Sequence, residues 1–391
     1  MRQLFAVTLL LLMMTPCLMA QKTKANNARQ ELSQARSSIK SGNYTDAEKR
    51  VSTLLKDSTN RTNKKIWLAY YDAVLGQYEQ GNEKLYLKQQ YDTAAFFAKA
   101  LQLLTIAESI DSLATDNRKS HSQQLNVLRP NIFNGGSFLL RKGKWAEAYR
   151  YYEAYIDCAR QPLFQAFRYD SLDTRMPEAA YWATYCGYKQ EDAVLTLRYS
   201  KQALKDTTKA DFTLQFIAEA RKWLKDDELY VKTLEEGFRR YPQFHYFFPR
   251  LMDAYNGMGQ NEKALALADS ALAVDPNSEL FLFAKSTTLL RMERYAESIK
   301  YSERLIEVNP NLAEPYFNAG TAYVNIADRL SARNDKKLTK QAYQKACPYM
   351  EHYRKLMPQE QAKWAPVLYR IYLNLNMGKQ FDEIDRLLKE K

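Results

Sequence analysis

Two consecutive segments of the chain carry apolar and small residues at matching positions, so that Ala264 and Ala271 in the first correspond to Ser298 and Leu305 in the second. The first segment reads NEKALALADSALAVDPN and the second reads RYAESIKYSERLIEVNPN, with apolar residues recurring every three or four positions. That spacing predicts an amphipathic helix in each segment, and Pro276 and Pro310 predict where the helices end. Small residues such as Ala264 and Ala271, together with Ala268, predict close packing of the first of these helices against its neighbours.

The same offset relates the helices that precede these segments, where Tyr255 and Gly259 correspond to Leu289 and Glu293. This offset and pattern resemble the tetratricopeptide repeat, whose unit of about 34 residues is a pair of antiparallel helices. The resemblance is best over residues 211–326 and implies an all-α fold, a right-handed α-solenoid. We count about nine antiparallel helix pairs along the chain, each sharing its core with the next.

The changes in periodicity divide the chain into five segments. We expect a signal peptide at 1–20, N-terminal helical repeats at 21–160, an inserted loop at 161–176, regular repeats at 177–326, and C-terminal repeats with a cap at 327–391.

The N-terminal repeats contain a helix pair longer than the repeat. Its helices are predicted over Lys64–Lys88 and Tyr91–Asp111. A long, tyrosine-rich pair near one end of a solenoid suits an N-terminal cap or a dimer face, and both interpretations stay open.

The first residues have the features of a secretory signal. Arg2 precedes an apolar run from Leu4 to Met14, which is too short to span a membrane, and the small residue Ala20 suits cleavage. We therefore expect an exported bacterial protein, cleaved near Ala20, in the periplasm or associated with the outer membrane. Cys17 leaves open an alternative in which the chain is lipidated.

Composition agrees with an exported helical repeat. Only 12 glycines and 12 prolines occur in 391 residues, which leaves long segments free of helix breakers. The formal charge is +12, which suits nucleic acid, an anionic envelope surface or an acidic partner. Export argues against nucleic acid.

No catalytic motif stands in the sequence. Gly76 and Gly81 have the spacing of a phosphate-binding loop, but the lysine and hydroxyl that would hold phosphate and metal are missing. The three histidines are far apart along the chain. We therefore expect a non-enzymatic protein with no cofactor and no metal site.

Three cysteines follow the predicted cleavage site. Small buried residues are the simple interpretation of Cys158, Cys186 and Cys347, and a Cys158–Cys186 disulfide is the alternative.

The resemblance also implies where a partner binds, because the first helix of each tetratricopeptide pair lines a concave face. By register, the predicted partner-binding residues are Phe133, Arg141, Tyr181, Tyr185, Phe212, Lys222, Trp223, Tyr246, Asn256, Phe283, Arg291, Phe317 and Asn325. The inserted loop adds Phe164, Phe167 and Tyr169, which either pack over the solenoid or contact a ligand, and both alternatives stay open. Pro249 and Asp253 occupy positions where the family's two-carboxylate clamp has Lys and Asn, so that clamp is absent.

This mixture of aromatic, amide and basic residues suits an extended protein or peptide segment. We therefore predict a scaffold in the cell envelope that binds a protein or peptide partner. A glycan-binding protein with a helical-repeat body is the alternative, because aromatic rings also stack on sugars.

Overall fold

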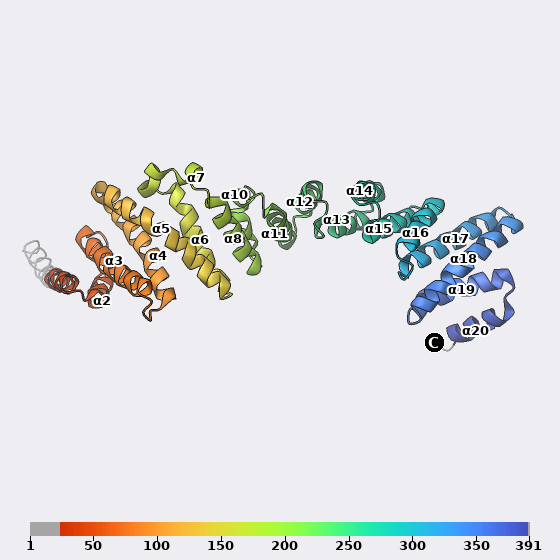
Figure 1. Cartoon of the computed structure of the whole chain (residues 1–391), viewed down its shortest axis with the longest axis horizontal. Helices are drawn as coiled ribbons and strands as arrows, with labels where there is room; N and C mark the ends of the chain where they lie inside the picture. Colours follow the sequence, from red (N-terminus) through yellow and green to blue (C-terminus); the bar gives the residue numbers. More distant parts are fainter. Residues whose placement is uncertain (1–23, 390–391) are drawn as a thin grey trace, which may run out of the picture. The chain divides into compact units, whose positions relative to one another are not determined.

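A computed structural model describes residues 24–389, and in this range the chain forms helices and no β-strand. The predicted signal peptide and Cys17 lie outside the described residues. The chain divides into two compact units, unit 1 up to Asp226 and unit 2 from Asp227 onwards. Figure 1 labels most of the helices of both units.

Unit 1 consists of helices that pair with their neighbours along the chain. The helices are 24–40, α2 (Tyr44–Leu54), α3 (Lys64–Tyr86), α4 (Thr93–Leu113), α5 (Arg118–Arg141), α6 (Trp145–Asp157), α7 (Tyr169–Leu172), α8 (Met176–Lys189), α9 (Ala193–Arg198), α10 (Ser200–Ala203) and α11 (Ala210–Trp223). The predicted loop 161–176 therefore holds the short helix α7, preceded by a 3₁₀ turn over Pro162–Phe167.

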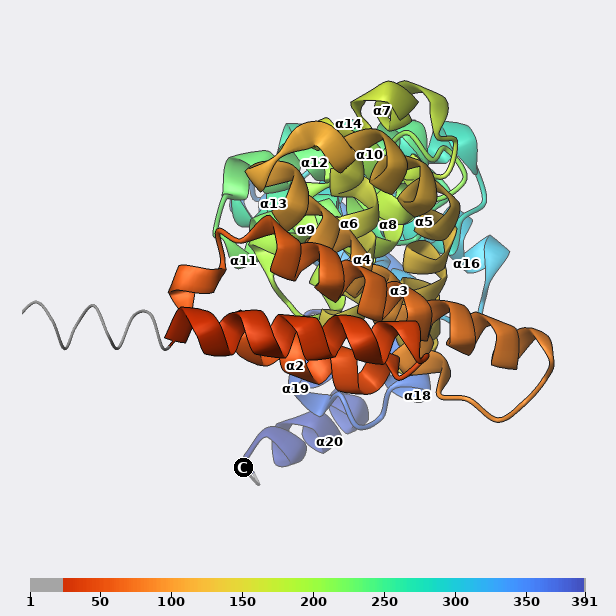
Figure 2. The same ribbon diagram turned by 90° about the vertical axis from the view of Figure 1, so that its left-hand side faces the viewer.

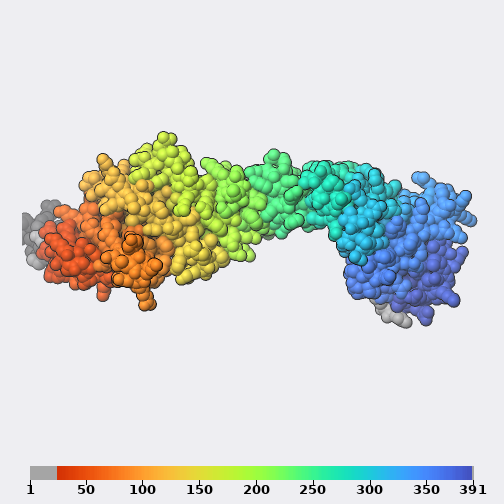
Figure 3. Space-filling model, viewed as in Figure 1, coloured from red at the N-terminus to blue at the C-terminus, as the bar shows by residue number. Residues whose placement is uncertain are grey.

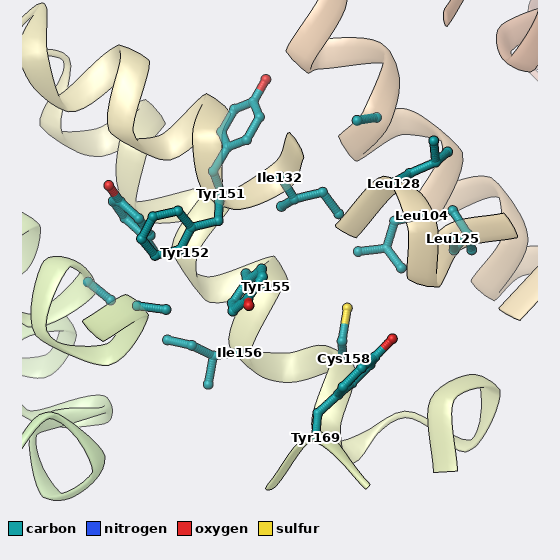
Figure 4. Packing of buried hydrophobic residues seen from close by; sticks show 14 of the residues in the cluster. Leu104, Leu125, Leu128, Ile132, Tyr151, Tyr152, Tyr155, Ile156, Cys158 and Tyr169 are labelled. Atoms are coloured by element: carbon teal, nitrogen blue, oxygen red, sulfur yellow. The ribbon is translucent and has the colours of Figure 1, made fainter. Parts of the chain in front are cut away.

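Aromatic side chains set the spacing between the helices of unit 1. The Tyr152 ring of α6 is fully buried, and a Cβ added at Gly136 of α5 would lie 3.0 Å from it. Glycine on one helix thus makes room for a tyrosine on the next. Figure 4 shows this core, with Ile132 and Tyr155 inside it and Tyr169 at its border.

The long pair formed by α3 and α4 extends past the neighbouring helices at the turn that joins them (Figure 2). Tyr86 and Leu87 at this turn are exposed. In the described part of the chain, α4 is the one helix whose length and composition would suit a membrane span. Its Leu103, Ile106 and Ile110 belong to the buried core of unit 1.

Unit 2 begins with a single helix and continues as four pairs. Its helices are α12 (Asp227–Arg240), α13 (Phe247–Gly257), α14 (Asn261–Val274), α15 (Glu279–Arg291), α16 (Tyr295–Val308), α17 (Glu314–Ala332), α18 (Lys336–Leu356), α19 (Gln361–Leu375) and α20 (Gly378–Lys389). Helix α16 begins and ends 34 residues after α14 begins and ends, which is the offset that the sequence pattern predicts.

The turn inside each regular pair uses one residue with positive φ. Glu191, Lys225, Gly259 and Glu293 have φ of +54°, +57°, +67° and +59°, and they follow one another at this same offset. The backbone conformation of the turn therefore repeats even where the residue is not glycine. The next such residue, Asn334, comes later than the offset requires, because α17 is longer than α13 and α15, the first helices of the two pairs before it.

The all-α, tetratricopeptide-like fold is thus confirmed, and the right-handed sense and the count of about nine pairs stay predictions. The boundary between the units, after Asp226, does not coincide with any predicted segment boundary. The disulfide alternative is wrong for this structure: Cys158, Cys186 and Cys347 are free and buried.

Candidate partner-binding surface

The sixteen residues predicted to face a partner differ widely in accessibility. The buried ones are Phe133, Phe164, Tyr169, Tyr181 and Tyr246. The exposed ones are Arg141, Phe212, Lys222 and Arg291, and the half-buried ones are Phe167, Tyr185, Trp223, Asn256, Phe283, Phe317 and Asn325. The prediction of exposure is wrong for Phe133, Tyr181 and Tyr246, because packing covers their rings. Phe164 and Tyr169 follow the alternative in which the loop aromatics pack over the solenoid.

Phe133 and Tyr181 show the reason. The ring of Phe133 lies 5.4 Å from that of Tyr152 and 5.5 Å from that of Tyr155, both on the next helix, α6. Tyr181 of α8 lies 6.0 Å from Phe216 of α11. Phe133 thus packs inside its own helix pair and Tyr181 packs against the first helix of the next pair, so both rings are covered.

The inserted segment is fixed to unit 1 by a buried arginine. The Arg129 guanidinium of α5 lies 3.6 Å from the ring centroid of Tyr155 and 3.8 Å from that of Tyr169, so it is held between two aromatic faces. It also makes an ion pair of 2.5 Å with Asp173. The Tyr169 hydroxyl donates to Asn126 Oδ1 at 2.6 Å.

These contacts lower the pKa of the Asp173 carboxyl. Burial raises the pKa of this carboxyl, but hydrogen bonds from Arg129 and Tyr155 outweigh burial, and the net shift is downward. The segment around α7 therefore packs against α5 through charged and aromatic contacts, and its outer side forms part of the surface of unit 1 (Figure 3). Of its three predicted contact residues, only Phe167 keeps some exposure.

A continuous row of aromatic rings crosses three helices of unit 1 and is partly accessible. We call it the aromatic band; it consists of Trp145, Trp182, Tyr185, Tyr188, Phe216 and Trp223. Trp145 of α6 and Trp182 of α8 each present an edge-to-face contact to Tyr185, with ring centroids 5.8 Å apart. Tyr185 in turn lies 5.7 Å from Phe216 of α11. Except for the buried Phe216, every ring in the band is half-buried.

Tyr188 closes the band at its end on α11. Its ring stacks on Phe216 at 4.6 Å and on Trp223 at 5.8 Å. Phe216 and Trp223 lie two turns apart on one helix, which separates them by about 10 Å. The Tyr188 ring fills that space and so has both faces covered. Tyr188 therefore presents mainly the edge of its ring to solvent.

Exposed cations lie at the ends of α5, α8 and α11 and at the turns that follow, beside the helices of the band. We call Arg141, Lys142, Lys189, Lys222 and Lys225 the basic edge; all five are exposed. First helices of stacked pairs run parallel, so their C-terminal ends lie at one edge of the unit. The Lys189 ammonium lies 5.6 Å from the centroid of the Trp145 ring, which joins the edge to the band.

The carboxylates at these turns are mostly engaged elsewhere. Glu147 pairs with Lys144 at 3.1 Å, and Asp226 pairs with Arg221 at 3.6 Å. Asp192 accepts a hydrogen bond from the backbone N–H of Leu195 and so caps α9. None of the five cations of the basic edge has an ion pair with another described residue, so their charge faces solvent.

The remaining predicted residues lie in unit 2 on α13, α15 and α17. Phe283 lines a cavity of about 310 Å³ together with Leu280 and Leu312. Phe317 packs on Tyr353, with 5.0 Å between the ring centroids. These residues do not form an aromatic row comparable to the band in unit 1.

The sequence predicted Tyr185 and Trp223 as contact residues. It missed Trp145, Trp182 and Phe216. The available signal was the density of large aromatics between Trp145 and Trp223. Their contacts could not be seen, because Trp145 and Tyr185 belong to different helix pairs.

The cysteines and two of the histidines in residues 24–389 are held in packing contacts. Burial raises the pKa of Cys158, Cys186 and Cys347 to about 12, so each stays a thiol at neutral pH. The His121 ring packs in a tilted contact on Tyr71 and the His352 ring stacks on Tyr316, with ring centroids 4.3 Å and 4.1 Å apart. No group of histidine, cysteine and acidic residues in the described range could hold a metal ion.

The fold and this surface define a helical-repeat protein with a partly exposed aromatic face. No protein-family model matches the chain, and no curated protein sequence matches it. Solved structures similar to it include the C-terminal part of a tetratricopeptide repeat-containing protein from Cytophaga hutchinsonii, with 14% identity over 64% of this chain and 92% of that one and a TM-score of 0.43.

Two further similar structures come from eukaryotes. A human IFIT1 dimer with PPP-AAAA has 14% identity, covering 80% of this chain and 71% of that one, with a TM-score of 0.36. The TPR2AB domain of yeast Sti1 in a complex with pHSP90 has 15% identity, covering 78% and 98%, with a TM-score of 0.28. Since these scores are low, the tetratricopeptide-like fold is assigned from the chain's own helix pairs and their regular register.

Proposed function

We propose that this protein is a non-enzymatic scaffold of the bacterial cell envelope that binds an extended segment of a protein partner across the aromatic band. The observation that carries the proposal is the continuous row of half-buried rings from Trp145 to Trp223. Rings of this kind supply large apolar contact area at little cost in conformational entropy, which is why aromatic residues dominate binding energy at protein interfaces.

The ring geometry favours a protein segment over a sugar. A sugar ring binds by lying flat on a free aromatic face. In the band, Phe216 and Trp223 cover the faces of Tyr188, and Tyr185 meets its tryptophan neighbours in edge-to-face contacts. Apolar side chains of a peptide fit between ring edges without requiring a free face. A glycan partner is therefore the less favoured candidate.

The envelope location is part of the proposal and rests on the sequence of residues 2–20. N-terminal sequencing of the protein purified from its native host should begin near Gln21. Recovery of chains that retain Met1 in the cytoplasmic fraction would contradict export. A mature chain that begins at Cys17 and carries lipid would place it on a membrane surface instead.

The binding test compares two full-length mature proteins in crosslinking pull-downs from envelope extract. One is the wild type and the other carries Trp145→Ala, Tyr185→Ala and Trp223→Ala. We expect the wild type to capture specific proteins that the band variant loses. Circular dichroism must show that the variant keeps its helices, because these rings also contribute to packing.

A matched control carries Tyr86→Ala, which removes an aromatic ring that is 85% exposed and lies in unit 1 outside the band. This control should capture the same proteins as the wild type. Equal capture by the folded band variant and the wild type would refute the band as the binding surface. Retention of envelope glycans in place of proteins would favour the glycan alternative.

A further inference from the structure

The positive charge of the protein is concentrated in unit 1. Residues 24–226 contain 31 Lys and Arg against 23 Asp and Glu, a balance of +8. Residues 227–389 contain 23 against 21, a balance of +2. The aromatic band thus lies in the strongly basic unit.

Within unit 1, the basic edge concentrates this charge beside the band. The segments 141–147, 189–192 and 221–226 hold seven basic and four acidic residues. The pairs Lys144–Glu147 and Arg221–Asp226 remove two cations and two acids from this balance. The Asp192 carboxylate caps α9 through a backbone N–H and keeps its negative charge. Five exposed cations then remain against two carboxylates, those of Glu191 and Asp192, which leaves a local balance of +3.

We infer that the partner segment is acidic: its aspartate or glutamate side chains pair with the basic edge while its apolar side chains lie on the aromatic band. This inference rests on the proposed function and specifies the chemistry of its partner. The cations lie at the turns between first and second helices, at the border of the band, and not at the positions of the family's two-carboxylate clamp.

The arrangement of the rings argues for an acidic protein segment over a nucleic acid. Single-stranded nucleic acid binds aromatic surfaces by stacking bases on free ring faces. The Tyr188 ring has no free face, and Lys189 lies over the ring of Trp145. A peptide needs only apolar edge contacts and charge pairing, both of which the surface offers.

The test selects ligands without assuming their sequence. The full-length mature protein, the band variant described above and a basic-edge variant with Lys142→Glu, Lys189→Glu and Lys222→Glu are each used to pan a random peptide library. Peptides enriched by the wild type and not by the band variant define the band ligands. We expect these ligands to contain Asp and Glu well above their frequency in the library.

Fluorescence anisotropy then measures the affinity of selected peptides for each protein. We expect the basic-edge variant to bind about tenfold more weakly, as the loss of three exposed charge pairs would give. Raising the salt concentration from about 50 mM to about 300 mM should weaken wild-type binding, because it screens exposed charges.

A second triple variant controls for net charge. Lys56→Glu, Lys119→Glu and Lys205→Glu changes the charge of unit 1 by the same amount at exposed lysines that have no ion pair with a described residue and lie away from the basic edge. It should bind the peptides as the wild type does. Equal weakening by both triple variants would mean that overall charge, and not this edge, attracts the peptide.

The outcomes separate this inference from the proposed function. If peptides are selected through the band but are neutral or basic, or bind the basic-edge variant as tightly as the wild type, the acidic partner is refuted and the docking surface stands. If the band variant selects the same peptides as the wild type, the proposed function fails. Tighter binding of a random-sequence single-stranded RNA through the same basic edge would overturn the inference in favour of a nucleic acid.

Discussion

Gly259 and Glu293 occupy equivalent turns of successive helix pairs in unit 2, and both adopt the left-handed backbone conformation, with φ of +67° and +59°. Only glycine adopts this conformation without a steric cost between Cβ and the following carbonyl. The left-handed conformation therefore depends on the position in the repeat and not on the residue type. Several of these turns hold a residue for which the conformation is sterically unfavourable.

This relationship predicts opposite effects for two substitutions. Gly259→Ala should lower the free energy of unfolding by about 1 kcal/mol, because a Cβ at this position meets no other atom and only the backbone conformation is penalised. Glu191→Gly, at φ +54° in unit 1, should raise stability by about 0.5 kcal/mol or more. Urea denaturation followed by circular dichroism measures both.

Gly257→Ala provides the comparison for Gly259→Ala. Gly257 is the last residue of α13, its φ is not positive, and its Cβ would also meet no atom. This change should be neutral or stabilising, because alanine favours the helix. Similar losses from both alanine variants would show that backbone conformation is not the cause.

Arg129→Met should release the inserted segment from α5. The change leaves the Asp173 carboxylate without its ion pair and removes the cation between Tyr155 and Tyr169, at an expected cost of about 3 kcal/mol. Trypsin cleaves after exposed arginines, and Arg168 and Arg175 lie in this segment. Cleavage at these two sites should become much faster in the variant.

Arg160→Met serves as the control for that experiment. The Arg160 side chain is 73% exposed and lies 3.8 Å from Asp157, so its loss should leave the cleavage rate at the other two arginines unchanged. An Arg129→Met protein that resists trypsin as the wild type does would show that the segment does not depend on this contact.

The ion pair of Arg129 also predicts a pH dependence. The pKa of Asp173 is lower in the folded chain than its ordinary value, which is about 3.9 in the unfolded chain. The carboxylate therefore stabilises the fold above about pH 4, and this contribution disappears as the pH falls through the folded-state pKa. The stability difference between wild type and Asp173→Asn should be large at pH 7 and small near pH 2.

Other carboxylates titrate in both proteins, so their effects cancel in that difference. Denaturation curves at a series of pH values give the result directly. A difference that is constant between pH 7 and pH 2 would mean that the ionised carboxylate of Asp173 does not stabilise the fold.

The three buried thiols should be unreactive in the native protein. Because burial raises their pKa to about 12, a thiol-specific reagent at pH 8 should label none of Cys158, Cys186 and Cys347 until denaturant is added. The denatured mature chain should then show three free thiols. Finding only one would demonstrate a disulfide and contradict the structure.

The sequence predicted the helices well where the repeat register is regular. The segments around Ala264 and Ser298 became α14 and α16 with the expected ends, because helix periodicity and proline stops are local properties of the chain. The long helix expected over Lys64–Lys88 is present as α3 for the same reason. The positive φ of Glu191 could not be foreseen, because glutamate carries no signal for that conformation.

The candidate surface was predicted less well. Phe133 and Trp223 were assigned to the same kind of position, yet Phe133 is buried against α6 while Trp223 keeps part of its ring accessible. An aromatic residue on a helix suits both a core and a binding surface, so its type does not distinguish them. Arg129 gave no sign of its role, because its partners Tyr155, Tyr169 and Asp173 come from separate elements.

By itself the sequence determined an all-α chain built from a repeating helix pair, because local periodicity, proline stops and helix propensity act over a few turns of one segment. Only the tertiary structure decided which aromatics are covered and which remain at the surface. That outcome depends on how closely each helix approaches the next, as glycine permits at Gly136 beside Tyr152. Such distances are set jointly by residues far apart in the chain, and no single segment contains them.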